Sequence, residues 1–526
     1  MYIWDQDLAT SLMFSAKEIF RAGFSEDKPP DYLTGIYKGE DIMLTLPFRS
    51  TKQLVSLIRR KKVGCLELLD LYLQRIERYN SEINAIIFMD VEVARKRARA
   101  ADKALARDEL WGPYHGVPMT IKESFDVTGM PTTWGLPHYK NNYPMKNAIV
   151  VERLLNAGAV IFGKTNVPLY LADWQTFNEI YGTTNNPWDV TLVPGGSSGG
   201  SAAALAAGLT SLEAGSDIGA SIRNPAHYCG VYGHKPTYGI ISSQGQALPG
   251  VVAEPDIAAV GPMARSADDL AVALDVMAGP DDIDQKGWQV RLPKPKKKKL
   301  SDYHVAVIYT DPEAEVDDEV QKRIQDLIAF LAKNKVKVRE NARPKIDSRK
   351  AHRNYIQLLR AATAGRLTPE EFLRNLEALK TLRPNDESYR AQMIRAQAMY
   401  HKDWLKLNES RHRMRLAWAD FFREYDLLLC PTATTIAFPH NQKGERWERM
   451  IMVNGKPQPS TTQMFWAGYS CNTYLPSTVA PAGFSSNGLP VGVQIVGPQY
   501  GDHSCIHFAR LLEREFQSFR PPPGFD

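Results

Sequence analysis

Residues 195–200 read GGSSGG and residues 215–223 read GSDIGASIR, two stretches rich in glycine and serine. In the first, glycines flank Ser197 and Ser198, and glycine lets a backbone adopt conformations that other residues avoid. Strained backbone is concentrated at active sites, so the stretch favours a catalytic serine. A flexible loop is one alternative. The others are a phosphate-binding loop, which lacks its Lys-Ser/Thr ending here, and a G-x-S-x-G turn, which lacks the strand that should precede it.

The second stretch places small residues before Ser221. Gly219 and Ala220 allow a substrate to approach the backbone closely. Ser221 then begins a short helical turn, and backbone N–H groups at the start of a helix have no intrahelical acceptor. Such groups are suited to stabilise the oxyanion of a tetrahedral intermediate. By itself this turn would not indicate a catalytic site, and it does so only together with residues 195–200.

Upstream, residues 115–126 read HGVPMTIKESFD and predict a turn followed by a buried strand. Lys122 follows Val117, Met119 and Ile121 along this strand. Taken alone, a lysine is usually a surface residue. On an apolar strand, burial disfavours the charged ammonium and so lowers the pKa of a lysine, which makes Lys122 a candidate base.

Taken together, these blocks resemble the amidase signature family. Ser197 and Ser221 are 24 residues apart, which is the separation that the family shows between its cis-serine and its nucleophile. Further matching blocks lie at residues 163–166, 184–189, 261–266 and 488–494. The resemblance runs in order from about residue 50 to residue 516. It implies an α/β fold with one large twisted mixed β-sheet covered by helices on both faces.

The resemblance also implies a mechanism, residue by residue. Ser221 is the nucleophile, Ser197 follows a cis peptide bond from Gly196, and Lys122 is the uncharged base. The proton of Ser221 passes through Ser197 to Lys122, and Ser197 then returns it to the departing amine. The resemblance also implies an oxyanion hole formed by the backbone N–H groups of Ile218, Gly219, Ala220 and Ser221. The supporting residues are Gly196, Ser198, Asp217 and Arg223. We expect Asp217 and Arg223 to pair with one another or to hold the loop.

Three positions depart from the family pattern, and none of them is Lys122, Ser197 or Ser221. Ala220 stands where glycine is usual, which strains the residue if its φ is positive and narrows the acyl site. His234 replaces an apolar residue, and Leu169 replaces an acidic one. His227 and His234 leave a Ser-His-Asp triad as an alternative. Cys229 is a further candidate nucleophile, which we interpret as a buried, inert thiol.

Outside these blocks, apolar patterns alternate between helices and short strands, which indicates an α/β sheet with covered faces. We expect helices at residues 50–79 (two, with Ser50 as N-cap and a break at Gly64), 91–107, 149–156, 201–207, 317–333, 345–423 and 503–516, and strands at 84–89, 159–162, 209–215, 303–309, 335–339, 426–430 and 491–496. We divide the chain into an N-terminal extension that packs on the core (1–49), a catalytic domain (50–516) whose variable helical region (345–423) shapes the substrate pocket, and a C-terminal tail (517–526).

The bulk composition is that of an ordinary globular enzyme. A net charge of +5 over 526 residues is too small to suggest a nucleic-acid partner, and we interpret the lysine run at 294–299 as a solvated linker. Five scattered cysteines argue against a disulfide framework or a zinc site. The N-terminus lacks a secretory signal and no stretch is apolar enough to span a membrane. We therefore expect a cytoplasmic monomer or homodimer that needs no cofactor or metal.

The resemblance leaves the substrate open. The first hypothesis is a free-standing amidohydrolase. The second is the A subunit of a glutamyl-tRNA amidotransferase, although residues 240–250 depart from the segment usual in that protein. The third is an inactive scaffold. Apolar residues of the loop 440–470 are predicted to line the pockets and favour hydrophobic or aryl amides, with esters and carbamates as further substrates. These residues are Trp447, Met450, Met452, Phe465 and Trp466.

Overall fold

The computed structural model of the protein describes residues 45–525, so the predicted extension at 1–49 lies almost wholly outside the described residues. From Pro47 onward the chain forms one unit. Its first long helix begins as predicted at Ser50, whose hydroxyl accepts the N–H of Gln53 at 3.2 Å while the Gln53 side chain accepts the N–H of Ser50 at 3.0 Å. Gly64 then separates this helix from the next, also as predicted.

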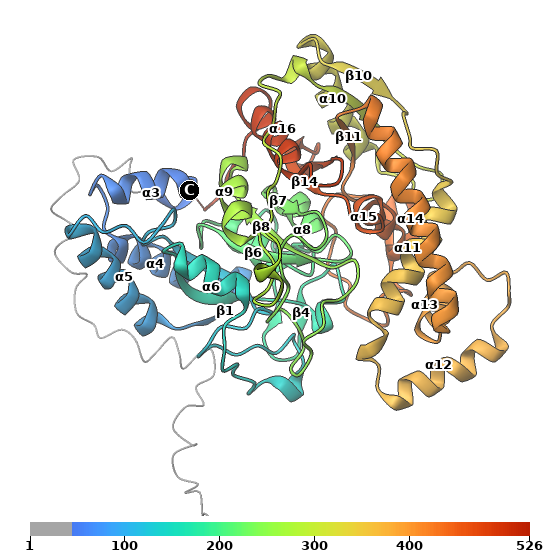
Figure 1. Ribbon diagram of the computed structural model, residues 1–526, viewed down its shortest axis with the longest axis horizontal. Helices are drawn as coiled ribbons and strands as arrows, with labels where there is room; N and C mark the ends of the chain where they lie inside the picture. The colour runs from blue at the N-terminus through green and yellow to red at the C-terminus, as the bar shows by residue number, and fades with distance from the viewer. Residues whose placement is uncertain (1–44, 526) are drawn as a thin grey trace, which may run out of the picture. The chain divides into compact units, whose positions relative to one another are not determined.

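Eight strands form the main sheet, in the order β10-β9-β11-β15-β14-β7-β8-β6 (Figure 1). β9 pairs in parallel with β10 and β11, and the other neighbours are antiparallel, so the sheet is mixed as expected. Its strands are β6 (Glu213–Asp217), β7 (Tyr232–Lys235), β8 (Ala259–Ala264), β9 (His304–Val307), β10 (Lys337–Glu340), β11 (Leu427–Pro431), β14 (Ser477–Phe484) and β15 (Pro490–Val496).

A second sheet of three strands lies beside the β6 edge of the main one. It has the order β1-β3-β2, with β1 (Ile86–Met89), β2 (Pro118–Lys122) and β3 (Val160–Thr165). β2 and β6 are joined by side chains: the Thr120 hydroxyl donates to the Glu213 carboxylate, and the Thr120 N–H donates to Thr210 Oγ1 at 2.9 Å. This contact brings the end of β2 next to the end of β6, where the predicted site residues lie. Two short hairpins complete the strands, β4 (Phe177–Asn178) with β5 (Gly182–Thr183), and β12 (Met450–Val453) with β13 (Lys456–Pro459).

Helices cover the main sheet. α8 packs on β7, β14 and β15, while α9 and α16 pack on one another and on β7, β8, β14 and β15, so the central strands are covered on both faces. None of the helices formed by residues 45–525 is long and apolar enough to cross a membrane. The longer helices are α3 (Thr51–Arg59), α4 (Cys65–Ile83), α5 (Val91–Ala106), α6 (Ile149–Asn156), α7 (Gly199–Ala206), α8 (Arg223–Cys229), α9 (Ala267–Met277), α10 (Asp318–Lys333), α11 (Ser348–Ala362), α12 (Pro369–Thr381), α13 (Tyr389–Gln397), α14 (His401–Glu424), α15 (Met464–Cys471) and α16 (Asp502–Glu515).

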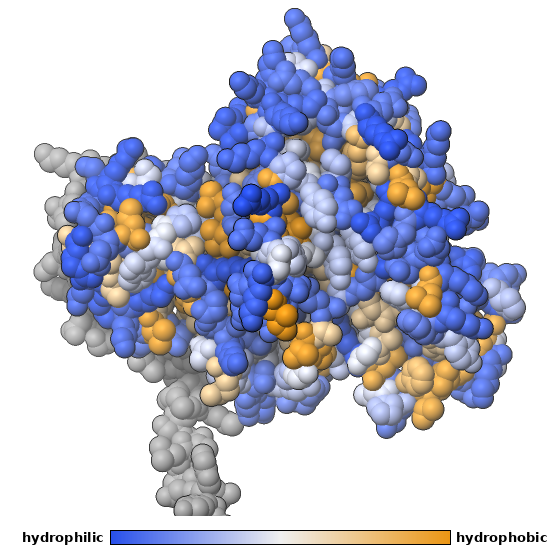
Figure 2. Space-filling model, viewed as in Figure 1, coloured by the Kyte–Doolittle hydropathy of each residue, from blue (hydrophilic) through white to orange (hydrophobic). Residues whose placement is uncertain are grey.

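The predicted helical region at 345–423 is α11 to α14. α11 packs against α13, α14 and α15, and Figure 1 shows this group beside the main sheet. α12 has no buried residue, and Figure 2 shows apolar side chains exposed over it, where Phe372 and Leu373 lie. At the C-terminus, residues 517–525 form no helix or strand, but the ring of Phe525 packs on Tyr79 of α4 with centroids 4.9 Å apart.

Candidate active site

Lys122 is the last residue of β2 and is fully buried. Its Nζ lies 2.7 Å from Ser197 Oγ, 2.9 Å from Ser198 Oγ and 3.1 Å from Ser216 Oγ. Burial lowers the pKa of Lys122 to about 7, against the opposing effect of neighbouring carboxylates, of which Asp217 is the strongest. An amine with this pKa is largely uncharged just above neutral pH, as a general base must be.

The glycine-rich stretch leads directly into α7. The peptide bond between Gly196 and Ser197 is cis, as the resemblance implied. A side chain at Gly196 would not fit, because its Cβ would lie 2.3 Å from the carbonyl oxygen of Asp173. Ser198 also contacts Lys122, so distance from the base does not separate the two serines, and the preference for Ser197 still depends on the spacing to Ser221.

Ser221 lies between β6 and α8 and is 6% exposed. Its carbonyl oxygen accepts the N–H of Ser198 at 3.0 Å, so the two stretches are in direct contact. Its hydroxyl makes no hydrogen bond to any of the residues 45–525, Ser197 included, and lies at the wall of a pocket. The structure therefore shows the contact between Ser197 and Lys122, which is the second link of the predicted relay, and leaves the Ser221 hydroxyl facing the pocket.

The loop before Ser221 presents backbone N–H groups. Tyr355 donates its hydroxyl to the carbonyl of Ile218 at 3.0 Å, and Trp174 donates its indole N–H to the carbonyl of Gly219 at 2.8 Å. Within the described chain the N–H groups of Ile218, Gly219 and Ser221 donate to no acceptor, so three donors are free for an oxyanion.

The fourth predicted donor is occupied. The N–H of Ala220 donates to Asp217 Oδ1 at 2.9 Å, so the oxyanion-hole prediction is wrong for this residue in the present conformation. The φ of Ala220 is 68°, in the left-handed region. Alanine is strained in that region, as expected for a position where the family usually has glycine. Its methyl group is buried in a cluster with Tyr355 and Cys471, which offsets part of the cost of that conformation.

Asp217 and Arg223 form the predicted pair. Both side chains are fully buried, and the guanidinium lies 2.9 and 3.0 Å from the two carboxylate oxygens. Burial opposes the charge on Asp217, but Arg223 and hydrogen bonds outweigh it and lower the carboxyl pKa to about 2. Asp217 also accepts the N–H of Ile222 at 3.1 Å, so the pair fixes the turn that carries Ser221.

The pocket at Ser221 encloses about 720 Å³, including its open mouth. The loop residues Ile218 and Gly219 form one wall, and the apolar side chains Trp174, Phe438 and Met464 form others. The helical region 345–423 also contributes residues to this pocket, from α11 and the turn after it.

Comparison with known proteins decides the family. The family model described as Amidase matches residues 67–506. The chain belongs to the amidase signature family. As a member, it is an amide-cleaving hydrolase, and its α/β fold is that of the family.

Named relatives of this amidase differ in their reactions. It is 31% identical over 501 residues to the glutamyl-tRNA(Gln) amidotransferase A subunit of Moorella thermoacetica, covering 91% of this chain and 100% of the relative. It is 30% identical over 506 residues to human fatty-acid amide hydrolase 2, covering 90% of each chain. Among solved structures, 6-aminohexanoate cyclic dimer hydrolase with its substrate matches with a TM-score of 0.72 and 26% identity, covering 91% of this chain and 100% of that one.

The alternative catalytic residues, His227, His234 and Cys229, have structural roles in this amidase. His227 accepts the N–H of Gly492 at 2.7 Å and lies 3.0 Å from the carbonyl oxygen of Thr435, while His234 lies 3.2 Å from Asp502. Neither histidine forms a hydrogen bond with Ser221 in the described part of the chain. Cys229 is buried, and burial raises the pKa of its thiol, which is the inert state predicted.

The prediction for the loop 440–470 is wrong in its particular residues. None of the five predicted side chains lines the Ser221 pocket. This segment instead gives the pocket Arg446, Ser460, Thr461, Gln463 and Met464. Met450 and Met452 are exposed because they alternate along β12 with the buried Ile451 and Val453.

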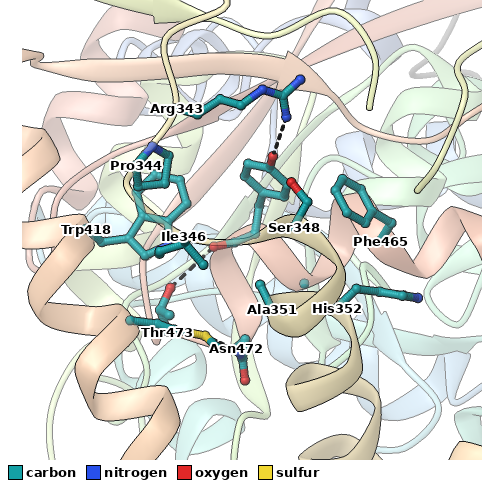
Figure 3. Close-up of a pocket in the computed structure, with 13 residues that line it drawn as sticks. Arg343, Pro344, Ile346, Ser348, Ala351, His352, Trp418, Phe465, Asn472 and Thr473 are labelled. Carbon is teal, nitrogen blue, oxygen red and sulfur yellow. Dashed lines mark hydrogen bonds between the residues drawn. The ribbon is translucent and has the colours of Figure 1, made fainter. Parts of the chain in front are cut away.

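Phe465 lines a different cavity, formed by α11, α14, α15 and the segment before α11 (Figure 3). The walls of this cavity include Ile346 and Trp418, which come from segments far from Phe465 in the sequence. Ser221 is not among the residues around it. Aromatic content in the sequence therefore indicated a cavity of the fold, and did not distinguish it from the substrate pocket.

Two polar residues beside Lys122 were not predicted from the sequence. Ser216 lies 3.1 Å from Lys122 Nζ and accepts the side-chain N–H of Gln246 at 3.1 Å, and Gln246 also donates to Ser124. Ser216 directly precedes Asp217 in the second quoted stretch, and that position is a signal that could have indicated it. Gln246 lies in the segment 240–250 that departs from the amidotransferase pattern, and no local pattern indicates that it reaches the site.

We expect Asp217→Asn to destabilise the protein by about 3–5 kcal/mol, because it leaves the buried Arg223 without its countercharge. The free energy of unfolding in urea measures this loss. Glu109→Gln is the matched control, since Glu109 pairs with Arg107 at 2.7 Å with both side chains more than half exposed. It should change the free energy of unfolding far less, because an exposed ion pair contributes little to stability. Equal losses for the two variants would contradict the role given to Asp217.

Proposed function

We propose that the protein hydrolyses carboxamides through an acyl-enzyme on Ser221, with Ser197 and Lys122 as its proton relay. The observation that carries the proposal is the 2.7 Å contact between Ser197 Oγ and the buried, pKa-depressed amine of Lys122. In this relay the unpaired Ser221 hydroxyl turns toward Ser197 as its oxygen attacks the carbonyl carbon. The proton then passes from Ser221 to Ser197, while Ser197 passes its own to Lys122.

The free N–H groups then act on the intermediate. Negative charge develops on the former carbonyl oxygen, and Ile218, Gly219 and Ser221 supply donors that need no reorganisation. Lys122 returns its proton through Ser197 to the nitrogen, the C–N bond breaks, and the amine leaves. Water repeats the attack on the acyl-enzyme and releases the acid.

The pocket supports substrates with an apolar body. Trp174, Phe438 and Met464 present apolar surface next to Ser221, which suits hydrophobic or aryl amides. The same chemistry extends to esters and carbamates, whose leaving groups need less protonation than an amine.

A fluorophosphonate probe and a substrate panel test this function. We expect the probe to label Ser221, found by peptide mass analysis, and the purified chain to release amine from at least one hydrophobic anilide. The panel comprises aliphatic, fatty acyl and aryl amides, with matched esters and carbamates. Folded protein that neither reacts with the probe at Ser221 nor cleaves any member would favour an inactive scaffold.

A second candidate is supported by the relatives named as the A subunit of glutamyl-tRNA(Gln) amidotransferase. In that role the same acyl-enzyme chemistry would act within a complex. Turnover of small amides by the isolated chain favours the free-standing hydrolase. A chain that is labelled by the probe yet turns over only glutamine, and only with added partner proteins, favours the amidotransferase.

A further inference from the structure

Three arginines line the pocket that contains Ser221. Arg360 comes from α11, Arg366 from the turn after it, and Arg446 from the loop before β12. Asp173 is the only acidic residue that lines this pocket among the described residues, and it already pairs with Arg449 at 2.5 Å. The pocket therefore carries an excess of positive charge that its own acid does not balance.

Arg360 is the least satisfied of the three. It is 6% exposed, and its Nε has no hydrogen-bond partner in residues 45–525. Its Nη2 lies 4.0 Å from the sulfur of Met464, and its guanidinium stacks 5.3 Å from the ring centroid of Tyr389. A buried guanidinium normally has oxygen acceptors, since burying a charge without them is costly.

Arg366 and Arg446 have partial structural roles. Arg366 donates to the carbonyl of Tyr170 at 3.0 Å, and Arg446 donates to the carbonyl of Ala172, so both hold the loop at one side of the pocket. Neutral carbonyls leave both charges uncompensated, and no ion pair within the described residues includes any of the three arginines. Burial, and then the charge of Arg446, lowers the pKa of Arg360 and of Arg366 to about 10. Holding a loop thus explains two of the arginines in part and leaves Arg360 unexplained.

We propose that Arg360, supported by Arg366 and Arg446, binds a carboxylate carried by the substrate. The inference rests on the proposed function and narrows its substrate class to amides with an apolar spacer between the scissile bond and a carboxylate. Guanidinium and carboxylate form paired, charge-assisted hydrogen bonds, which would satisfy the free Nε of Arg360. The apolar spacer would pack on Trp174, Phe438 and Met464 between the two ends.

Matched inhibitors and substrates test the proposal. The mono-p-nitroanilides of adipic and suberic acid are compared with their methyl esters, which have nearly the same shape without the charge. Turnover gives kcat/KM for each, and protection of Ser221 from the fluorophosphonate probe by the corresponding anilides gives a binding readout that needs no turnover. We expect the acid to exceed its methyl ester at least about tenfold in one or both measurements.

Variants assign the effect to the arginines. Arg360→Gln should lower kcat/KM or protection for the acid about tenfold or more, and change the methyl ester less than about threefold. Arg446→Gln, at a partly exposed position, provides a second variant if Arg360→Gln does not fold, and should reduce the same preference. Arg353→Gln is the matched control, since Arg353 lies two turns earlier on α11, pairs with Glu387 and does not line this pocket.

The outcomes separate the two proposals. Ser221 labelling with equal behaviour of acid and methyl ester would overturn the carboxylate site and leave the acyl-enzyme intact. An acid preference that survives in both arginine variants would also overturn it. Absence of labelling at Ser221 would remove the proposed function and this inference together.

Discussion

Ser221→Ala is expected to lower kcat/KM for every amide that the protein cleaves by about 10⁴-fold or more, because no acyl-enzyme can form without the hydroxyl. The side chain forms no hydrogen bond within the described chain, so its removal should change the free energy of unfolding by less than about 1 kcal/mol. Steady-state hydrolysis and urea unfolding measure the two effects. Fluorophosphonate labelling of the variant should vanish in parallel.

Ser197→Ala and Ser198→Ala separate the two serines that contact Lys122. If Ser197 carries the proton, its loss should reduce the rate nearly as much as that of Ser221, whereas Ser198→Ala should retain a much larger fraction. The contacts at 2.7 and 2.9 Å do not distinguish these serines, so the rates of the two variants must distinguish them.

A Ser221→Ala enzyme with substantial amide turnover would refute the assignment of Ser221 as the nucleophile.

The sequence predicted the elements that have strong local signals. The N-cap at Ser50 and the break at Gly64 gave the boundaries of the first two long helices, and the helix predicted at 149–156 matched α6 residue for residue. The division into two sheets was not predicted. It depends on Thr120 and Glu213, which join β2 to β6 through side chains where a continuous sheet would have backbone hydrogen bonds.

The site was predictable where its residues lie in contiguous stretches. Lys122 ends a strand that the sequence indicated, and Ser197 and Ser221 each lie two residues before a short helix. The pocket was not predictable, because its charged residues come from three separate segments. Arg360 lies on a helix whose pattern says only which face is buried, and nothing local shows that this face opens on Ser221.

The pH profile is the second large effect that follows from the structure. The proposed base must be uncharged to accept a proton, and burial sets the pKa of Lys122 to about 7. Below that pKa the amine is protonated, so kcat/KM should fall about tenfold for each pH unit of acidification, and above it the rate should level off. Hydrolysis of one neutral anilide from about pH 5 to about pH 9 measures this profile.

Lys122→Met tests the assignment of that inflection. Methionine is an unbranched side chain one atom shorter than lysine, and it fills most of the buried site without a titrating group. We expect kcat/KM to fall by about 10³-fold or more and the residual rate to lose its inflection near pH 7. Lys164→Met is the matched control: Lys164 is equally buried on β3 and its pKa is lowered to about 8, but its Nζ binds the carbonyl of Glu123 at 3.0 Å and contacts neither serine. That control should lose stability and keep the inflection, because its amine supports the β2–β3 segment and takes no part in the relay. An inflection that persists in Lys122→Met and disappears in Lys164→Met would transfer the base to the neighbouring strand.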